Sequence, residues 1–231
     1  MPSESLIPPH GGYKKLRTCK LGNLIYDATA AFCEQYYDRK DRTYDQMVQA
    51  ARSGVANIIE GSEASATSKK TELKLTNVAK ASQEELLSDY QSFLRQRGLP
   101  EWSANSPAAQ MVRRARPETL DQLRQLMAVL VADPTWGEKQ TDAIGARDHR
   151  TCPTRPTESA KNETGPARAK VLRKAEVAGN VMICLINQET YLLGRQIARL
   201  AADFEQNGGF TERLYRIRSE IRKKQNDQRE N

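Results

Sequence analysis

The sequence has few of the residues on which catalytic and metal sites usually depend. It contains two histidines, His10 and His149, both in segments that we expect to be mobile. Its four cysteines are scattered without a C-x-x-C pair, so neither a zinc site nor a disulfide framework is indicated. The Glu-x-x-His motif of metal-binding bundles is missing, and no base is paired with a nucleophile. We therefore expect no metal, no cofactor, no catalytic residues and no enzyme activity.

Long apolar runs and aromatic residues are scarce as well. No run approaches the roughly 20 residues that cross a bilayer, and residues 1–20 lack the apolar core of a secretory signal. These absences predict a cytoplasmic protein without a membrane contact. Aromatic residues make up only 6% of the chain, whereas Ala, Leu, Gln, Glu, Lys and Arg are abundant. Because this composition favours helices over sheets, we expect an all-α protein.

Basic residues are in excess. The 231 residues carry a formal net charge of +7, and 38% of them are hydrophobic, which is enough to bury a core. A basic surface attracts phosphate-rich polymers and releases their counterions on binding, so the charge favours an anionic partner. A merely well-solvated surface has the same composition and stays open as the alternative.

Apolar residues recur at helical spacing in four long segments, which we expect to be the main helices. These segments are residues 13–37, 43–60, 68–97 and 169–206. Ser68 is suited to cap the third helix at its start, and Gly98 with Pro100 ends it. Gly61 is expected to stop the second helix, because glycine readily adopts the left-handed conformation at a helix end.

Shorter elements are expected in the second half of the chain. Residues 108–115 and 118–131 each predict a short helix, and Thr211 looks like the N-cap of a basic amphipathic helix over 212–224. Residues 133–168 are crowded with Pro, Gly, Thr, Ser and mixed charges, and cannot bury enough apolar area to offset their ordering entropy. We therefore expect a partly disordered insertion there.

These signals divide the chain into five segments. They are a flexible N-terminus (1–12), helices one to three (13–98), an insertion with short helices and a disordered linker (99–168), a fourth long helix (169–207), and a C-terminal basic helix and tail (208–231). Periodicity alone leaves open whether residues 118–131 or 169–206 pack as the fourth helix.

Residues 47–61 place polar side chains inside an apolar helical pattern. Buried charged groups need partners, and the third helix offers Ser82 and Glu85. We therefore expect a buried polar network that fixes the register of the helices, rather than an exposed ligand or catalytic site. Its expected members are Arg52, Asn57, Glu60, Ser82 and Glu85.

The same stretch carries a family resemblance. Q-A-A-R-S-G-V-A-N-I-I-E-G resembles the R-x-x-x-S-x-x-x-N-I-A-E-G type signature of a four-helix-bundle family associated with intervening sequences in large-subunit ribosomal RNA genes. That family includes the accessory variability proteins of diversity-generating retroelements. The residues that match are Arg52, Asn57, Ile58, Glu60 and Gly61, whereas Ile59 replaces the usual alanine.

Two further segments are similar to this family. K-K-T-E-L-K-L-T-N-V-A-K-A-S-Q-E-E-L resembles its third helix, S-K-K-E-F-x-x-F-L-x-x-A-x-G-S-x-x-E-L. I-C-L-I-N-Q-E-T-Y-L-L-G-R-Q-I-A-R-L, followed by G-G-F-T-E-R-L-Y-R-I-R, is similar to a subgroup with a four-helix-bundle suffix domain. The resemblance implies an antiparallel four-helix bundle in which residues 169–206 supply the fourth helix, with an insertion between helices three and four and an extra C-terminal basic helix.

The resemblance also implies a class of function. Family members can form small rings, pentameric in the retroelement accessory proteins, that bind nucleic acid and contact a reverse transcriptase through a basic surface. We expect a non-enzymatic, homo-oligomeric accessory protein that binds RNA or DNA. The expected contacts are Lys14, Lys15, Arg17, Lys20, Lys69, Lys70, Lys74, Arg213 and Arg216. The alternative is a protein-interaction scaffold whose C-terminal amphipathic helix docks a partner.

Overall fold

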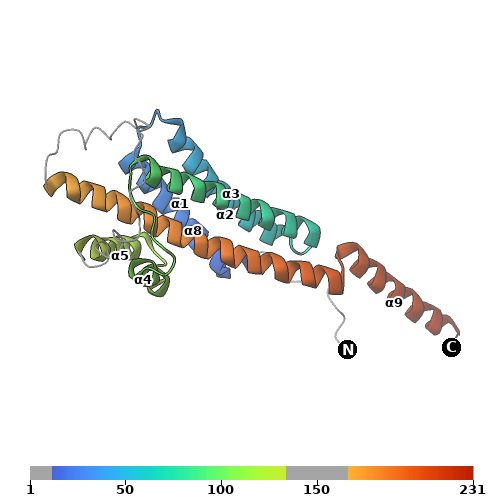
Figure 1. Ribbon diagram of the computed structural model, residues 1–231. Helices are drawn as coiled ribbons and strands as arrows, with labels where there is room; N and C mark the ends of the chain where they lie inside the picture. The colour runs from blue at the N-terminus through green and yellow to red at the C-terminus, as the bar shows by residue number, and fades with distance from the viewer. Residues whose placement is uncertain (1–11, 134–165, 231) are drawn as a thin grey trace.

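The computed structural model describes residues 12–133 and 166–230, whose secondary structure is entirely helical (Figure 1). The described residues form seven α-helices and a short 3-10 helix, η1 (Gly12–Lys15), and contain no β-strand. The all-α prediction is therefore confirmed. The flexible start predicted for residues 1–12 and the linker predicted within residues 99–168 fall mostly on residues 1–11 and 134–165, which lie outside the described ranges, as do both histidines.

Four long helices make up most of the structure (Figure 1). They are α1 (Arg17–Tyr36), α2 (Arg42–Ala64), α3 (Lys69–Gln96) and α8 (Pro166–Asn207). α2 packs along both α1 and α3, and α8 packs along both α1 and α3 as well. The apolar stripes of these helices therefore meet in one shared core.

The ends of α3 follow from local chemistry, as predicted. The Ser68 side chain accepts a hydrogen bond from the Thr71 backbone N–H at 3.1 Å and caps the first turn. Gly98 has a φ of 65°, the left-handed conformation that glycine adopts without steric cost. At the end of α8, Gly208 plays the same role with a φ of 66°.

The predicted stop of α2 at Gly61 is wrong, because the helix continues to Ala64. Gly61 is buried against α3, and a Cβ there would lie 3.4 Å from the Leu75 Cβ. A glycine inside a helix is less favourable than an alanine by about 1 kcal/mol, and the packing of this last turn against α3 outweighs that cost. The glycine thus marks a close approach of two helices and not a helix end.

The predicted N-cap at Thr211 is also wrong. α9 runs over Phe210–Glu230, so it begins two residues before the predicted first helical residue, Glu212. The Glu212 carboxylate accepts a hydrogen bond from the Gly209 backbone N–H at 2.9 Å, so a glutamate in the first turn does the capping. α9 makes little contact with the other helices and projects from the end of α8 (Figure 1).

Two short helices from the predicted insertion belong to the packed part of the molecule. α4 (Pro107–Ala115) and α5 (Leu120–Ala132) both pack against α8. They bury Val112, Leu123 and Leu130 in the main core. The loop before α4 is fixed to α8, because the Trp102 backbone N–H donates to the Asn180 side chain at 2.7 Å. Within the described ranges no helix is long and apolar enough to cross a membrane.

Candidate nucleic-acid interface

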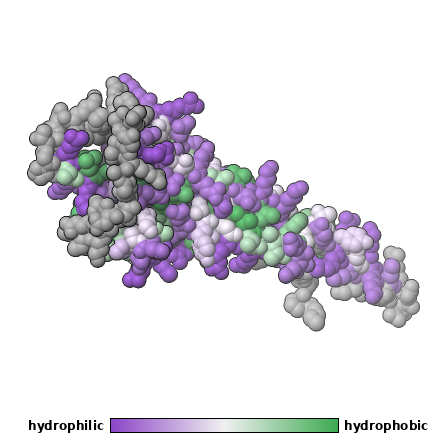
Figure 2. All heavy atoms as spheres, viewed as in Figure 1, coloured by the Kyte–Doolittle hydropathy of each residue, from purple (hydrophilic) through white to green (hydrophobic). Residues whose placement is uncertain are grey.

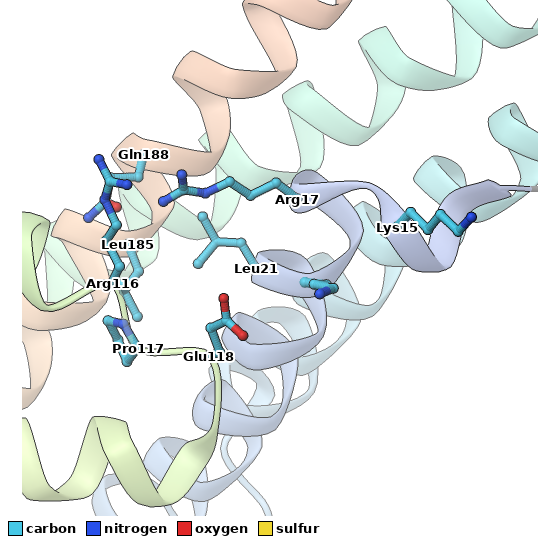
Figure 3. A pocket seen from close by; sticks show the side chains of 9 residues that line it. Lys15, Arg17, Leu21, Arg116, Pro117, Glu118, Leu185 and Gln188 are labelled. Carbon is cyan, nitrogen blue, oxygen red and sulfur yellow. The ribbon is translucent and has the colours of Figure 1, made fainter.

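A basic hollow of about 280 Å³ lies where the start of α1 meets α8 and the α4–α5 connection. We call it the α1 pocket, and Figure 3 shows its lining. Lys15, Arg17 and Lys20 come from η1 and the first turn of α1, and Arg116 comes from the α4–α5 connection. The other lining residues are Leu21, Pro117, Glu118, Leu185 and Gln188.

The charge of the α1 pocket is strongly unbalanced. Its lining carries four cationic side chains and a single carboxylate, that of Glu118. Among the described residues, none of the four cations forms an ion pair. In Figure 3 the Arg17 side chain extends toward Arg116 and Gln188, whereas Lys15 points away from them. Two guanidinium groups thus approach one another with no protein anion between them.

The backbone of α1 adds to this positive potential. The N-terminus of a helix carries a partial positive charge, and acidic residues in the first turn normally offset it. α1 has no acidic residue in its first turn, and its N-cap, Leu16, makes no side-chain hydrogen bond. Cations at this end of a helix are locally unfavourable by about 0.3–1 kcal/mol each. A bound anion would reverse that penalty.

Arg116 has an unusual backbone conformation. It ends α4 with φ 46° and ψ 56°, and it is the one described non-glycine residue with a positive φ. The left-handed conformation costs a non-glycine residue about 1–2 kcal/mol. The buried Pro117 follows directly and starts the connection to α5. Arg116 also lines a second hollow, of about 420 Å³, together with Gln110, Arg113 and Arg114 of α4. The basic surface therefore continues from α1 onto α4.

The structure brings only some of the predicted contact residues together. Lys15, Arg17 and Lys20 line the α1 pocket, and Lys14 is exposed beside them on η1. Lys70 and Lys74 are exposed on α3, at a separate location. Arg216 is exposed on α9, and the Arg213 side chain lies outside the described part of that helix.

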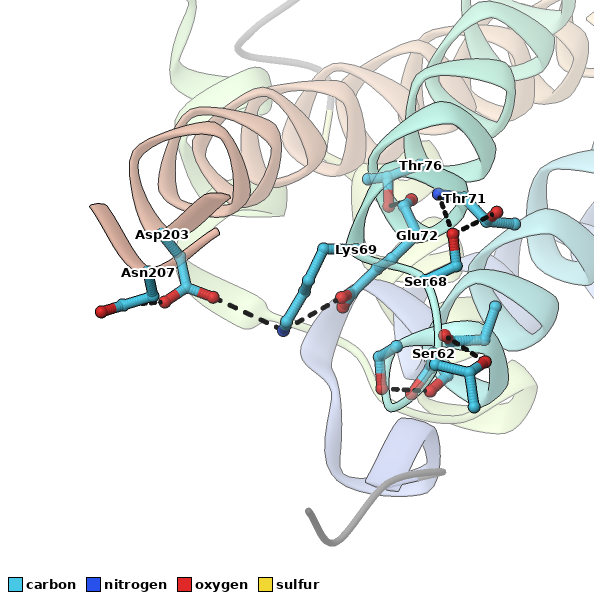
Figure 4. A network of polar contacts seen from close by, with 11 residues as sticks. Ser62, Ser68, Lys69, Thr71, Glu72, Thr76, Asp203 and Asn207 are labelled. Atoms are coloured by element: carbon cyan, nitrogen blue, oxygen red, sulfur yellow. Dashed lines mark hydrogen bonds and ion pairs between the residues drawn. The ribbon is translucent and has the colours of Figure 1, made fainter. Parts of the chain in front are cut away.

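Lys69 is a structural residue in this fold. Its ammonium lies 3.3 Å from the Glu72 carboxylate and 3.5 Å from the Asp203 carboxylate, so it links the start of α3 to the end of α8 (Figure 4). Burial raises the pKa of Glu72 despite the nearby Lys69, whereas a hydrogen bond from Asn207 lowers the pKa of Asp203. The lysine side chain is only 24% exposed. Its role as a nucleic-acid contact stays a prediction, and the two ion pairs with Glu72 and Asp203 weaken it because they already neutralise the ammonium.

The predicted polar network is reduced to a smaller cluster. Asn57 donates to the Ser53 backbone carbonyl at 2.8 Å, and Ser82 of α3 donates to the Ser53 hydroxyl at 3.2 Å. The other three predicted members, Arg52, Glu60 and Glu85, are exposed. Their positions on α2 and α3 lie on the solvent side of the contact, so they need no buried partner and the prediction is wrong for them.

The sequence analysis did not predict two of the buried polar side chains. Gln83 of α3 and Glu189 of α8 are both 0% exposed, and the described residues offer their side-chain N and O atoms no hydrogen-bond partner. Burial raises the pKa of Glu189 to about 8, so this carboxyl is largely neutral near pH 7. Both face glycines: a Cβ on Gly22 would lie 2.6 Å from a Glu189 carboxylate oxygen, and a Cβ on Gly54 would lie 2.3 Å from the Gln83 amide nitrogen.

Comparison of the chain with protein-family profiles, with curated proteins and with solved structures finds no match. Within residues 12–133 and 166–230, no cluster of His, Cys, Asp and Glu is arranged to hold a metal ion. The candidate site is the α1 pocket together with its extension onto α4. The sequence signals that bear on it are the cationic runs before Thr18 and before Pro117. Only the fold brings these two runs together.

Proposed function

We propose that the protein is a non-enzymatic, homo-oligomeric accessory protein that binds RNA or DNA through backbone phosphates. The observation that supports this most is the convergence of Arg17, Lys20 and Arg116, from two distant segments, in one hollow without a matching set of carboxylates. Unpaired cations at a helix N-terminus favour phosphate ligands.

The finer architecture is part of the proposal. We infer that α1, α2, α3 and α8 form an antiparallel four-helix bundle and that residues 99–168 are inserted between its third and fourth helices. Cross-helix neighbours support antiparallel pairs: Ser82 meets Ser53, and Thr18 donates to Gln196. Gly179 lies against Leu94, at the opposite end of α3 from the Lys69–Asp203 pair.

The composition of the basic surface favours contacts that do not depend on base sequence. The α1 pocket and the adjoining α4 hollow are lined by cationic, amide and aliphatic side chains and by the one carboxylate of Glu118, with no aromatic residue in either lining. Stacking of bases on aromatic rings is the usual basis of single-strand readout, so it is not expected at these two hollows. Phosphate contacts through lysine and arginine position a nucleic acid without reading its sequence.

Self-association follows from the resemblance and has one structural support. Figure 2 shows an apolar area over the N-terminal part of α3 and the adjoining part of α8. Val78 of α3 is a large apolar side chain that is 39% exposed. A ring of up to five copies would repeat the basic surface around an axis. A reverse transcriptase as partner and a cytoplasmic location complete the proposal. Light scattering on the purified chain tests the self-association, and a monomeric mass contradicts it.

Binding is tested with a labelled structured RNA titrated by fluorescence anisotropy at increasing salt. The logarithm of the affinity should fall linearly with the logarithm of the salt concentration, because each neutralised phosphate releases counterions. Absence of binding at low salt would exclude the proposal. Arg17→Gln combined with Arg116→Gln should weaken binding, whereas Arg52→Gln with Arg95→Gln removes the same charge outside the α1 pocket.

A protein-interaction scaffold remains the second candidate because of α9. This helix projects from α8, and its Tyr215 and Ile221 are 76% and 50% exposed. Exposed apolar side chains on a basic helix suit an acidic protein groove. Deletion of residues 208–231 separates the two functions. Loss of a protein partner with unchanged RNA binding favours the scaffold.

A further inference from the structure

We propose that the α1 pocket receives a terminal phosphate, a phosphomonoester, and not only the internal diesters of a nucleic-acid backbone. The inference rests on the proposed function, because the phosphate is taken to be the end of a bound nucleic acid. It specifies that the terminal phosphate is the group that enters the α1 pocket. The neighbouring α4 hollow and the exposed lysines contact the rest of the strand.

Charge matching supports the inference. An internal phosphodiester carries one negative charge, whereas a phosphomonoester carries about −1.5 to −2 at neutral pH and offers three acceptor oxygens. Because Lys15 points away from Arg116 and Gln188 (Figure 3), three cations, Arg17, Lys20 and Arg116, are opposed by the one carboxylate of Glu118. This excess of two positive charges matches a phosphomonoester better than a singly charged diester. Arg17 and Arg116 approach from opposite sides (Figure 3), so two planar guanidinium groups can each engage a different pair of phosphate oxygens.

Shape supports it too. The pocket volume of about 280 Å³ is small for a drug-sized ligand but suits a phosphate with the sugar attached to it. Below the cationic rim the lining is aliphatic, with Leu21 from α1 and Leu185 from α8, which offers a surface for the sugar carbons. The Gln188 amide nitrogen is buried and has no partner among the described residues, so the pocket wall also holds an unused donor.

The test compares two single-stranded RNAs of one sequence, one with a 5′-phosphate and one with a 5′-hydroxyl, at the same salt concentration. We expect the phosphorylated RNA to bind about tenfold more tightly, because charge-assisted hydrogen bonds to one additional anion contribute about 1.5 kcal/mol. Arg17→Gln with Arg116→Gln should abolish this ratio. Arg52→Gln with Arg95→Gln, on exposed parts of α2 and α3, should leave the ratio unchanged.

Each outcome has a defined meaning. Equal affinity of the wild-type protein for the two RNAs overturns the inference but not the proposed function. A preference that survives Arg17→Gln with Arg116→Gln overturns it as well. If neither RNA binds, the proposed function fails. An NMR titration with a nucleoside 5′-monophosphate and with the unphosphorylated nucleoside then shows whether the α1 pocket binds a phosphomonoester. Shifts of the Arg17 and Gln188 resonances with the monophosphate alone support it as a free-nucleotide site. Absence of such shifts overturns it.

Discussion

Replacing Glu189 with glutamine should change how stability depends on pH. This carboxyl is 0% exposed and has no hydrogen-bond partner among the described residues, so its ionised form is strongly disfavoured in the folded protein. Its pKa rises from the ordinary value of 4.5 to about 8, and burial is the cause. The adjacent Gly22 leaves the space that the carboxyl occupies.

The magnitude follows from proton linkage. Between pH 4.5 and pH 8 the unfolded chain has released the Glu189 proton while the folded protein retains it, so the free energy of unfolding falls as pH rises. At about 1.4 kcal/mol per pH unit this single group removes about 5 kcal/mol of stability over that interval. The loss is complete above pH 8, and the full stability is present below pH 4.5.

Urea unfolding followed by circular dichroism at several pH values measures the effect. Glu189→Gln should lack this slope, so its stability relative to the wild type should rise by about 5 kcal/mol from pH 4.5 to pH 8. Glu60→Gln is the matched control, since Glu60 is exposed on α2 and the same charge is removed. Parallel pH curves for the wild type and Glu189→Gln would refute the argument that a neutral carboxyl is buried in the core.

Three other substitutions test the packing of two glycines and the role assigned to Lys69. Gly54→Ala should lower the free energy of unfolding by about 1–3 kcal/mol in urea titrations, because its Cβ would lie 2.3 Å from the buried Gln83 amide. Gly194→Ala, whose Cβ meets only a lysine carbon at 4.0 Å, should instead stabilise α8 by about 0.5–1 kcal/mol. Lys69→Gln should leave RNA affinity unchanged, because carboxylates already pair that ammonium, and a loss as large as that of Arg17→Gln contradicts this.

Helix positions followed from the sequence because their signals are local. The cap at Ser68 and the left-handed Gly98 depend on a few neighbouring residues, and the structure has both. Gly61 and Thr211 were misjudged for a different reason. At Gly61, packing against α3 overrides the local tendency of glycine to end a helix. At Thr211, a glutamate side chain caps the helix instead of the hydroxyl.

The buried polar residues were less predictable. Helical spacing shows which residues share one side of a helix, but it does not show which side faces the neighbouring helix. A small rotation of α2 decides that Ser53 and Asn57 face α3 while Arg52 and Glu60 face solvent. Gln83 and Glu189 lie in segments whose pattern does not distinguish them from surface residues. The glycines opposite them, on α1 and α2, are what leave room for buried polar side chains.

The candidate site shows the same limit. The cationic cluster before Thr18 was identified from sequence, but its combination with Arg116 requires the packing of α4 and α5 on α8. Four helices, α1 to α4, lie between these two segments in the chain, so no local spacing rule joins them. Tertiary structure therefore determines which basic residues form a pocket and which remain dispersed.

The central claim is that the α1 pocket contacts nucleic-acid phosphates, and the salt dependence of RNA binding tests it most directly. Each phosphate contact that is lost should reduce the slope of log affinity against log salt by about 0.7–0.9. Arg17→Gln with Arg116→Gln should therefore lower the slope by about 0.7–0.9 if the two arginines share one phosphate and by about 1.4–1.8 if they contact two, and Arg52→Gln with Arg95→Gln should leave it unchanged. Equal slopes for the wild type and both double variants, or no RNA binding at low salt, would contradict the claim.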